Sequence, residues 1–459
     1  MSNNEEMNAN VDGRLEDSLM QINKLSYLMA PSLGIASART HVIGFPQQSE
    51  YKNGETMVWD SQTGNFFVDP VGSYITFNII PQFSGQIPTI SNLGFGSGSA
   101  VNCFNRIVAR TRSGKELTRV ENLNLFTKFH QRYTHNLDWM NTVGISQGYT
   151  QSPIIEPDAV IPDSNAYCDR IPNSGKKFVV PICAILPFMN QVSSRLMPPQ
   201  LMEGLRLEIS LEDPHVALCS VDGSANTTLI GYKITQPRIY WDVYTLADQF
   251  TRRIAEISAT KGLNLLHREY FHSSVASNNT ESNYDVKKAC SKALTCHIIA
   301  RDQSKVIGSD KITDAMASSP FEWVSIQSQI GSNYNPNQPL IVDDTTVNGN
   351  LEAYYFSIYG MNYFTNNNTP SVTPEEYTGD ATYNNIDVGR KQTYNNAMLT
   401  FNLNKSATSD IVGSVVNNSR SLLINLKRKS NPIANIRIDT WLCHVRAVKV
   451  FTSNCVVLD

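Results

Sequence analysis

The chain has no surplus of positive charge. Its 459 residues include 38 Lys and Arg against 41 Asp and Glu, so the formal net charge is -3 at pH 7. Proteins that coat nucleic acid need a basic surface, because phosphate binding is driven by cations that displace counterions. The balance of charge therefore argues against direct or sequence-specific binding of nucleic acid.

The sequence also lacks a long hydrophobic run. The longest nearly apolar stretch is FVVPICAILPFM at 178–189, which has 12 residues and contains two prolines. A membrane-spanning helix needs roughly 18 or more apolar residues. The first residues, MSNNEEMNANVDG, have neither the positive nor the apolar region of a secretory signal. We expect a soluble chain that is not exported and has no membrane span.

Metal-binding motifs are missing as well. The eight cysteines, at 103, 168, 183, 219, 290, 296, 443 and 455, form no CxxC pair, and the eight histidines never occur as HxH or HExxH. Cys290, Cys296 and His297 have suitable atoms for zinc, as do Cys443 and His444, but no two tight pairs of ligands occur. The pattern predicts buried free thiols in a reducing compartment and no metal site.

The sequence shows no pattern typical of a catalytic or cofactor site. The glycine-rich GFGSGSA at 94–100 is not expected to precede a helix, and SGKE at 113–116 lacks the rest of a phosphate-binding loop. A flexible loop and a turn between strands are the preferred interpretations. The acidic pairs Asp343–Asp344 and Glu375–Glu376 are adjacent, so their side chains cannot face each other across a glycosidic bond. We predict no catalytic residue, no cofactor and no enzyme activity.

The residues that are present favour β-structure. The composition is 41% hydrophobic, with 25 Gly, 21 Pro, 19 Tyr and 18 Phe, which favours strands and turns over long helices. At this length one hydrophobic core is rarely sufficient, so two domains are expected. An all-β chain with two domains follows.

Alternating segments fill the first part of the chain after residue 40. Strands are predicted within TMVWD, GSYITFNII, NCFNRIVARTRSGKEL, KFVVPICAIL, GLRLEISLED and KITQPRIYWDVY. In GLRLEISL, Leu205, Leu207 and Ile209 face one way, whereas Arg206 and Glu208 face the other. One face of this strand is expected to pack and the other to contact water.

The same kind of sequence then begins again. Strands are predicted within ALTCHIIARD, PFEWVSIQSQIG, LEAYYFSIYG, NNAMLTFNLN, SLLINLKRKS and IRIDTWLCHVRAVKVF. The order GLRLEISL then RIYWDVY corresponds to SLLINLKRK then IRIDTWLCHV. The basic KRK at 427–429 is either a strand end or a weak nuclear import signal. The chain is therefore predicted to repeat one architecture twice.

A short helix separates the two halves. In YTLADQFTRRIAEISATKGLNLL at 244–266, Phe250, Ile254 and Ile257 lie on one helical face. Thr245 and Asp248 are predicted to form a capping-box-like pair, and Gly262 is predicted to end the helix. We expect a first jelly roll at 36–245, a linking helix at 246–262 and a second jelly roll at 263–459, each with about eight short antiparallel strands.

Residues 1–35 are predicted to form an N-terminal arm. Within it, RLEDSLMQINKLSYLM at 14–29 places Leu15, Leu19, Ile22, Leu25 and Met29 at helical spacing. This amphipathic helix belongs either to an extended arm or to a helix packed on its own domain.

Five segments resemble the double jelly-roll major capsid proteins of polinton-like viruses, Polintons and virophages, in the adenovirus-type capsid lineage. They are NCFNRIVARTRSGKELTRVENLN, LPFMNQVSSRLMPPQLMEGLRLEISLED, ADQFTRRIAEISATKGLNL, SPFEWVSIQSQIGSNYNPNQPL and NNSRSLLINLKRKS with IRIDTWLCHVRAVKVF. The resemblance lies in arrangement and covers most of the chain after residue 100.

The resemblance implies a function. Such proteins form homotrimeric capsomers in which three chains place six jelly rolls in a ring, the pseudo-hexamer of an icosahedral DNA virus shell. It implies neighbouring capsomers, penton proteins and minor capsid proteins as partners. It also implies a location in the virion after synthesis in the host cytoplasm and assembly in the cytoplasm or the nucleus. The alternative is a carbohydrate-binding or attachment β-sandwich protein of a virion, which leaves the helix between two sandwiches unexplained.

One long polar segment is predicted to lie on the outer surface. Residues 362–396 contain Glu375, Glu376, Asp380 and Asp387 among Asn, Thr and Gly, a composition that predicts no core contribution. The capsid resemblance implies an outer loop here, whereas the arm at 14–29 would lie beneath the shell. The alternative is a loop folded flat between subunits.

Overall fold

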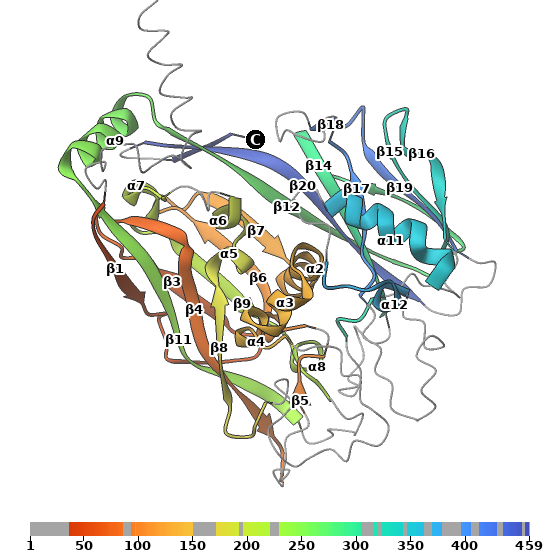
Figure 1. Cartoon of the computed structure of the whole chain (residues 1–459), viewed down its shortest axis with the longest axis horizontal. Helices are drawn as coiled ribbons and strands as arrows, with labels where there is room; N and C mark the ends of the chain where they lie inside the picture. Colours follow the sequence, from red (N-terminus) through yellow and green to blue (C-terminus); the bar gives the residue numbers. More distant parts are fainter. Residues whose placement is uncertain are drawn as a thin grey trace, which may run out of the picture.

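The computed structural model consists mainly of β-strands arranged as two sandwiches side by side (Figure 1). It describes residues 36–85, 93–96, 98–149, 171–191, 196–220, 229–303, 315–318, 323–342, 347–361, 370–378, 396–404, 413–428, 435–451 and 455–458. The predicted arm at 1–35, including the helix at 14–29, lies outside the described residues.

The first sandwich has two antiparallel sheets. Sheet A has the order β1-β11-β4-β8 and sheet B has the order β3-β9-β6-β7. The strands are β1 (Ala36–Gly44), β3 (Thr56–Asp60), β4 (Phe67–Phe83), β6 (Phe104–Arg110), β7 (Glu116–Glu121), β8 (Lys176–Pro181), β9 (Arg206–Leu211) and β11 (Leu229–Leu246). Short additions are β2 (Glu50–Lys52), β5 (Leu93–Gly94) and β10 (Cys219–Ser220).

The second sandwich is built in the same way. Sheet D has the order β12-β20-β14-β17 and sheet E has the order β13-β19-β15-β16. The strands are β12 (Leu263–Ser277), β13 (Glu281–Val286), β14 (Cys290–Asp302), β15 (Trp323–Ile330), β16 (Asn333–Ile341), β17 (Leu399–Asn402), β19 (Leu422–Arg428) and β20 (Ile436–Val450). β18 (Ser414–Val416) and β21 (Cys455–Leu458) are additional strands on sheet D.

The strand order is the same in both halves. Without the short additions, one sheet of each sandwich joins the first, eighth, third and sixth strands, and the other joins the second, seventh, fourth and fifth. This order is that of a jelly roll, and it occurs twice. The segments paired by sequence, GLRLEISL with SLLINLKRK and RIYWDVY with IRIDTWLCHV, are the seventh and eighth strands of the two rolls. The predicted double jelly roll is confirmed.

Side-chain alternation determines which face of each strand is buried. In β9, Leu207 and Ile209 are buried in the core between the two sheets, while Glu208 is half-buried on the opposite face. There Glu208 accepts hydrogen bonds from Arg206 and Arg110. The predicted faces of this strand are correct.

The linking helix α9 (Asp248–Thr260) follows β11 directly. Its N-cap is Ala247, which makes no side-chain cap hydrogen bond, and Thr245 still belongs to β11. The predicted capping pair of Thr245 with Asp248 is therefore wrong, because strand pairing with β1 continues to Leu246. The predicted end is correct: Gly262 has φ +74° and its N–H donates to the carbonyl of Ile257.

A helix connects the fifth and sixth strands of each roll. In the first roll this is α2 (Leu123–Thr134), and in the second it is α11 (Val347–Met361). The strand predicted within LEAYYFSIYG is therefore wrong. Ala353, Ser357, Gly360 and Met361 are buried at helical spacing, a period that a nearly continuous apolar run conceals.

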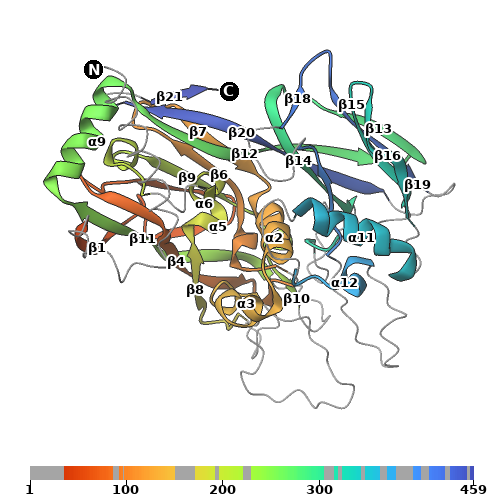
Figure 2. The same cartoon turned by 45° about the horizontal axis from the view of Figure 1, so that its top comes forward.

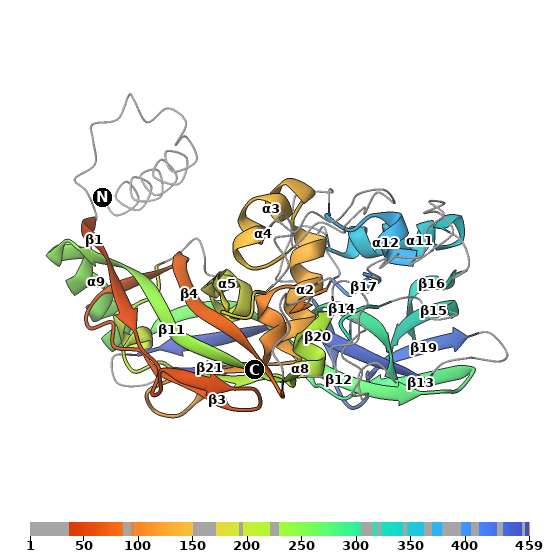
Figure 3. The ribbon, with the colours of Figure 1, turned by 90° about the horizontal axis from the view of Figure 1, so that it is seen from below.

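The strand predicted within KFVVPICAIL is shorter than expected. β8 ends at Pro181, and Ile182–Ile185 form the short helix α5. The remaining helices are short: η2 (Ala100–Cys103), α3 (Leu137–Asn141), α4 (Val143–Ser146), α6 (Pro187–Gln191), α7 (Pro199–Met202), α8 (Pro214–Ala217) and α12 (Pro374–Thr378). Figure 3 shows α2, α3, α11 and α12 on the same side of the sheets.

Candidate functional site at the seam between the two rolls

The described residues of the glycine-rich segment at 94–100 are part of the packed first roll. Phe95 is buried and stacks edge-on against Phe178 at 5.2 Å between ring centroids. The Ser99 hydroxyl accepts from the Val101 N–H and caps the four-residue 3₁₀ helix η2, so the expectation that no helix follows is wrong. SGKE at 113–116 is a turn between β6 and β7, as predicted, with Gly114 at φ +80°.

The residues considered for zinc do not converge. Cys296 and His297 are neighbours on β14, and Cys443 and His444 are neighbours on β20, so each pair points to opposite faces of sheet D. Within the described residues no three His, Cys, Asp or Glu side chains gather as metal ligands. Cys103, Cys183, Cys219, Cys290, Cys296 and Cys443 are free thiols.

The remaining polar candidates have structural partners or lie outside the described residues. Asp343 and Asp344 are outside, and so is Lys429, whereas Lys427 and Arg428 end β19. Most of 362–396 is also outside. The prediction that this segment contributes nothing to the core is wrong for its described part, because Val372 and Tyr377 are buried in the hydrophobic core. Glu376 lies 3.6 Å from Arg132 of α2.

The most elaborate polar site is the seam between the two rolls, and edge strands β7 and β12 form one part of it. The Arg119 backbone N–H donates to Glu269 Oε1 at 3.4 Å. Arg446 Nη1 donates to the Leu117 carbonyl at 3.2 Å and to Glu269 Oε2 at 2.7 Å. Burial raises the pKa of Glu269, and Arg446 opposes the rise. Glu269 thus joins the two rolls by hydrogen bonds from both.

Helix α2 forms the second part of the seam and lies over the outer face of sheet D (Figure 2). The Phe126 ring is 4.4 Å from the Tyr270 ring and 6.1 Å from that of Trp441. The Trp441 indole N–H donates to the carbonyl of Glu121, just before α2. Buried Lys128 donates through Nζ to the Met316 carbonyl at 2.6 Å. The helix therefore belongs to the first roll in sequence and packs as a layer of the second.

A buried ion cluster forms the third part. Asp439 of β20 is fully buried and accepts from Arg301 Nη2 at 2.8 Å, with His272 Nε2 at 3.0 Å and Arg437 Nε at 3.4 Å. Burial alone raises the pKa of Asp439, but Arg301 and His272 outweigh it and hold the pKa well below its usual range. Asn122 Nδ2 donates to Asp439 from the first roll at 3.4 Å. Asn122 has φ +47°, a conformation that Asn tolerates better than most residues.

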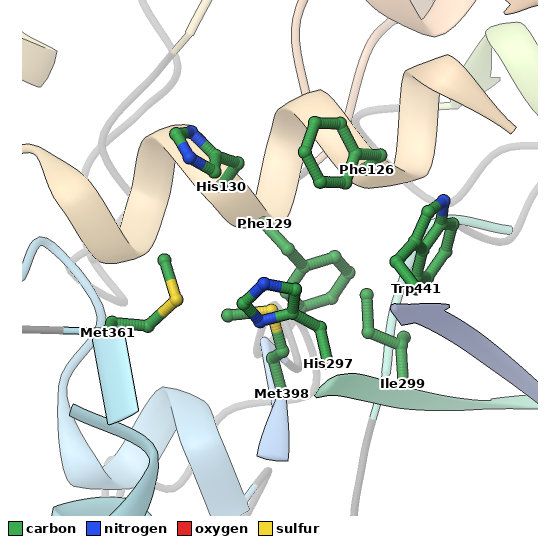
Figure 4. Close-up of a pocket in the computed structure, with 8 residues that line it drawn as sticks. All are labelled: Phe126, Phe129, His130, His297, Ile299, Met361, Met398 and Trp441. Carbon is green, nitrogen blue, oxygen red and sulfur yellow. The ribbon is translucent and has the colours of Figure 1, made fainter. Parts of the chain in front are cut away.

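A small apolar cavity remains beneath α2 (Figure 4). It is lined by Phe126, Phe129, His130, His297, Ile299, Met361, Met398 and Trp441. The cavity volume is about 10 Å³, which is enough for one water molecule at most. Burial lowers the pKa of His130 and His297 to about 3, so both imidazoles are neutral at neutral pH. The seam joins the two rolls, and this cavity within its described residues is too small for a substrate.

Sequence reasoning missed the seam, although a signal was present. Arg301 stands in ALTCHIIARD and Asp439 in IRIDTWLCHV, both charged residues within largely apolar strands. Such charges need a partner on an adjoining surface when they are buried. They indicate a face that is covered by another element, but they do not identify that element.

Comparison with known proteins supports the architecture. No protein-family model matches the chain, and no curated protein matches its sequence. Solved structures do match. PBCV-1 VP54, fitted into the virophage Sputnik, superimposes with a TM-score of 0.59 over 94% of this chain and 99% of that one, at 8% identity. The Faustovirus major capsid protein gives 0.56 over 92% of both chains at 9% identity.

The mavirus major capsid protein gives a TM-score of 0.51 over 94% of this chain and 92% of its own, at 10% identity. None of the helices described here is long and apolar enough to cross a membrane. At these identities the comparison is one of folds, and it agrees with the repeated strand order. The chain therefore has the double jelly-roll fold of the major capsid proteins of icosahedral viruses, virophages among them.

Proposed function

We propose that the chain is the major capsid protein of an icosahedral DNA virus and that it forms homotrimeric, pseudo-hexameric capsomers. The observation that carries the proposal is the jelly-roll strand order, present twice in one chain and joined through a buried seam. Three such chains supply six similar modules, which suits a six-coordinated position of a shell.

Structural neighbours strengthen the proposal. The Faustovirus and mavirus proteins are named as major capsid proteins, and each is covered over more than nine tenths of its length. The match includes both rolls and is not limited to a single β-sandwich, so it favours the capsid function over a carbohydrate-binding or attachment protein.

The proposal extends to partners and location. The chain would contact itself within the trimer, other capsomers across the shell, and penton and minor capsid proteins. It would be made in the host cytoplasm and reside in the virion. It would act as a structural protein without catalysis, a cofactor or a metal, and the seam described above would hold its two modules at a fixed angle.

Sedimentation of the purified protein tests the trimer. Three chains of 51.2 kDa give a particle of about 154 kDa. Obligate interfaces commonly bury on the order of 2,000–5,000 Å², so the trimer should persist at micromolar concentration. A single species of 51.2 kDa under native conditions would contradict the proposal.

A further inference from the structure

The seam inside the chain uses one side of each roll. The first roll contributes β7 and α2, its fifth strand and the helix that follows. The second roll contributes β12 and the outer face of sheet D. By the repeated strand order, the corresponding parts are β16 and α11 in the second roll, and β1 with the outer face of sheet A in the first. Each roll therefore has one side that the internal seam does not use.

The unused side of the second roll exposes apolar groups. On α11, Leu351, Tyr355 and Tyr359 follow one another at intervals of four residues and form a stripe, with Tyr355 70% exposed. On edge strand β16, Tyr334 is 46% and Ile341 63% exposed. We call these five residues the trailing face. The sequence of β16, NYNPNQPLI, has no charged residue, and its two prolines favour contact through side chains over strand pairing at this edge.

The unused side of the first roll also exposes apolar groups. Ile43, Tyr240 and Tyr74 are directly opposite one another across β1, β11 and β4, and the two tyrosine rings stack at 4.9 Å. Ile43 is 41% exposed, and Phe45, just beyond β1, is 62% exposed. We call these four residues the leading face.

The two rolls differ in how well equivalent features are covered. Both eighth strands carry a fully buried aspartate that pairs with arginine, Asp242 in β11 and Asp439 in β20. The Arg301 side chain that pairs with Asp439 is 4% exposed, whereas the Arg39 side chain that pairs with Asp242 is 57% exposed. Among the described residues, the aspartate–arginine pair of the first roll is therefore less covered than that of the second.

We propose that the trailing face of one copy docks on the leading face of a second copy, with α11 lying over sheet A as α2 lies over sheet D. The inference rests on the proposed function and identifies the surfaces that join the subunits. β1 and β16 lie at opposite ends of the molecule in Figures 1, 2 and 3, so the two faces cannot meet within one chain. A contact between two different faces of identical chains closes into a ring when the rotation permits.

A second copy is the occupant that the structure favours. Every chain carries both faces, and the internal seam shows that a helix after the fifth strand packs on an outer sheet face of this kind. Both faces combine aromatic and aliphatic side chains, which is the composition of the buried centre of stable interfaces.

Cross-linking tests the contact in the full chain. Tyr355→Cys combined with Ile43→Cys, treated with a bismaleimide, should give covalently linked dimers and trimers on a denaturing gel. Either single variant should give none above the wild-type background. Absence of linked species in the double variant, while sedimentation still shows a trimer, would overturn this inference and leave the proposed function intact.

A charge substitution tests the same contact independently. Tyr355→Asp should raise the dissociation constant of the trimer about tenfold or more, because a central aromatic residue is lost and a charge is buried. Val415→Asp is the matched control, since Val415 is exposed on β18, outside both faces, and should leave the trimer unchanged. Tyr355 is largely exposed in the single chain, so circular dichroism should show both variants folded. An unchanged trimer in Tyr355→Asp would contradict the inference, whereas a monomeric wild type would contradict the proposed function.

Discussion

Individual buried residues hold the two rolls together through charge and hydrogen bonding. Asp439 stays ionised because Arg301 and His272 contact it, and Glu269 receives hydrogen bonds from both rolls. Removing one partner from such a group leaves a buried charge unpaired, which commonly costs about 3–5 kcal/mol. His130, His267 and His297 behave differently, since burial keeps these three imidazoles neutral.

Acid should weaken the fold through these histidines. Burial lowers the pKa of His130, His267 and His297 to about 3, from 6.5 in the unfolded chain. Below pH 6.5 the unfolded state therefore binds more protons, and stability present above that pH is lost as pH falls toward 3. Between about pH 7 and pH 5 each histidine should reduce the free energy of unfolding by roughly 2 kcal/mol.

Urea unfolding at fixed protein concentration measures this loss. The His267→Phe variant keeps an aromatic ring against Phe188, which lies 4.9 Å away, but cannot take up a proton. Its loss of stability between the two pH values should be smaller by roughly 2 kcal/mol. A pH profile identical to that of the wild type would show that His267 does not titrate on unfolding.

Leu207 and Glu208 test the two faces of one strand. Leu207→Asp should abolish soluble folded protein, because an unpaired charge in the core costs several kcal/mol, comparable to the net stability of a domain. Glu208→Lys should still fold, because Glu208 lies on the outer face, although the variant loses the hydrogen bonds from Arg110 and Arg206. Glu208→Gln serves as the uncharged control. Soluble yield and circular dichroism provide the measurement. Equal yields of Leu207→Asp and Glu208→Lys would refute the assigned faces.

At the scale of elements, strands with one wet face were predictable. TMVWD matches β3 residue for residue, and alternation located β9 and β20. Where an apolar run packs on several sides, nearly every residue is apolar, so the sequence does not show whether the apolar positions repeat with the period of a helix or of a strand. That is why α11 was predicted as a strand and why β8 was extended into α5. The seam was beyond prediction because it depends on which distant element covers Asp439.

The end of the linking helix can be tested with two glycines of similar backbone conformation. Gly262 has φ +74°, and a Cβ there would lie 2.9 Å from the Phe451 ring. Gly54 has φ +81° with no atom within 4 Å of such a Cβ. Gly54→Ala should cost about 1–2 kcal/mol of unfolding free energy through the left-handed conformation alone.

Gly262→Ala should cost more than Gly54→Ala, because the added methyl group also displaces Phe451. Urea unfolding of the two variants, in parallel with the wild type, measures the difference. Equal costs would mean that the chain after α9 adjusts freely and that this turn does not fix the angle at which the second roll begins.

On the scale of the whole molecule, a repeated module explains both what is buried and what remains exposed. The internal seam covers one side of each roll, and the trailing and leading faces are the equivalent sides that stay exposed among the described residues. A ring of three chains would bury both faces in every copy. The sequence indicated the repeat, but the two exposed faces could be identified only from the positions of Tyr355 and Ile43 in the structure.

Cryo-electron microscopy of the purified wild-type protein tests the central claim most directly. The account predicts a ring of three chains with a six-lobed outline, in which α11 of each chain lies against sheet A of the next. A monomer, a two-fold symmetric dimer, or a trimer joined through other surfaces with Tyr355 in solvent would contradict it.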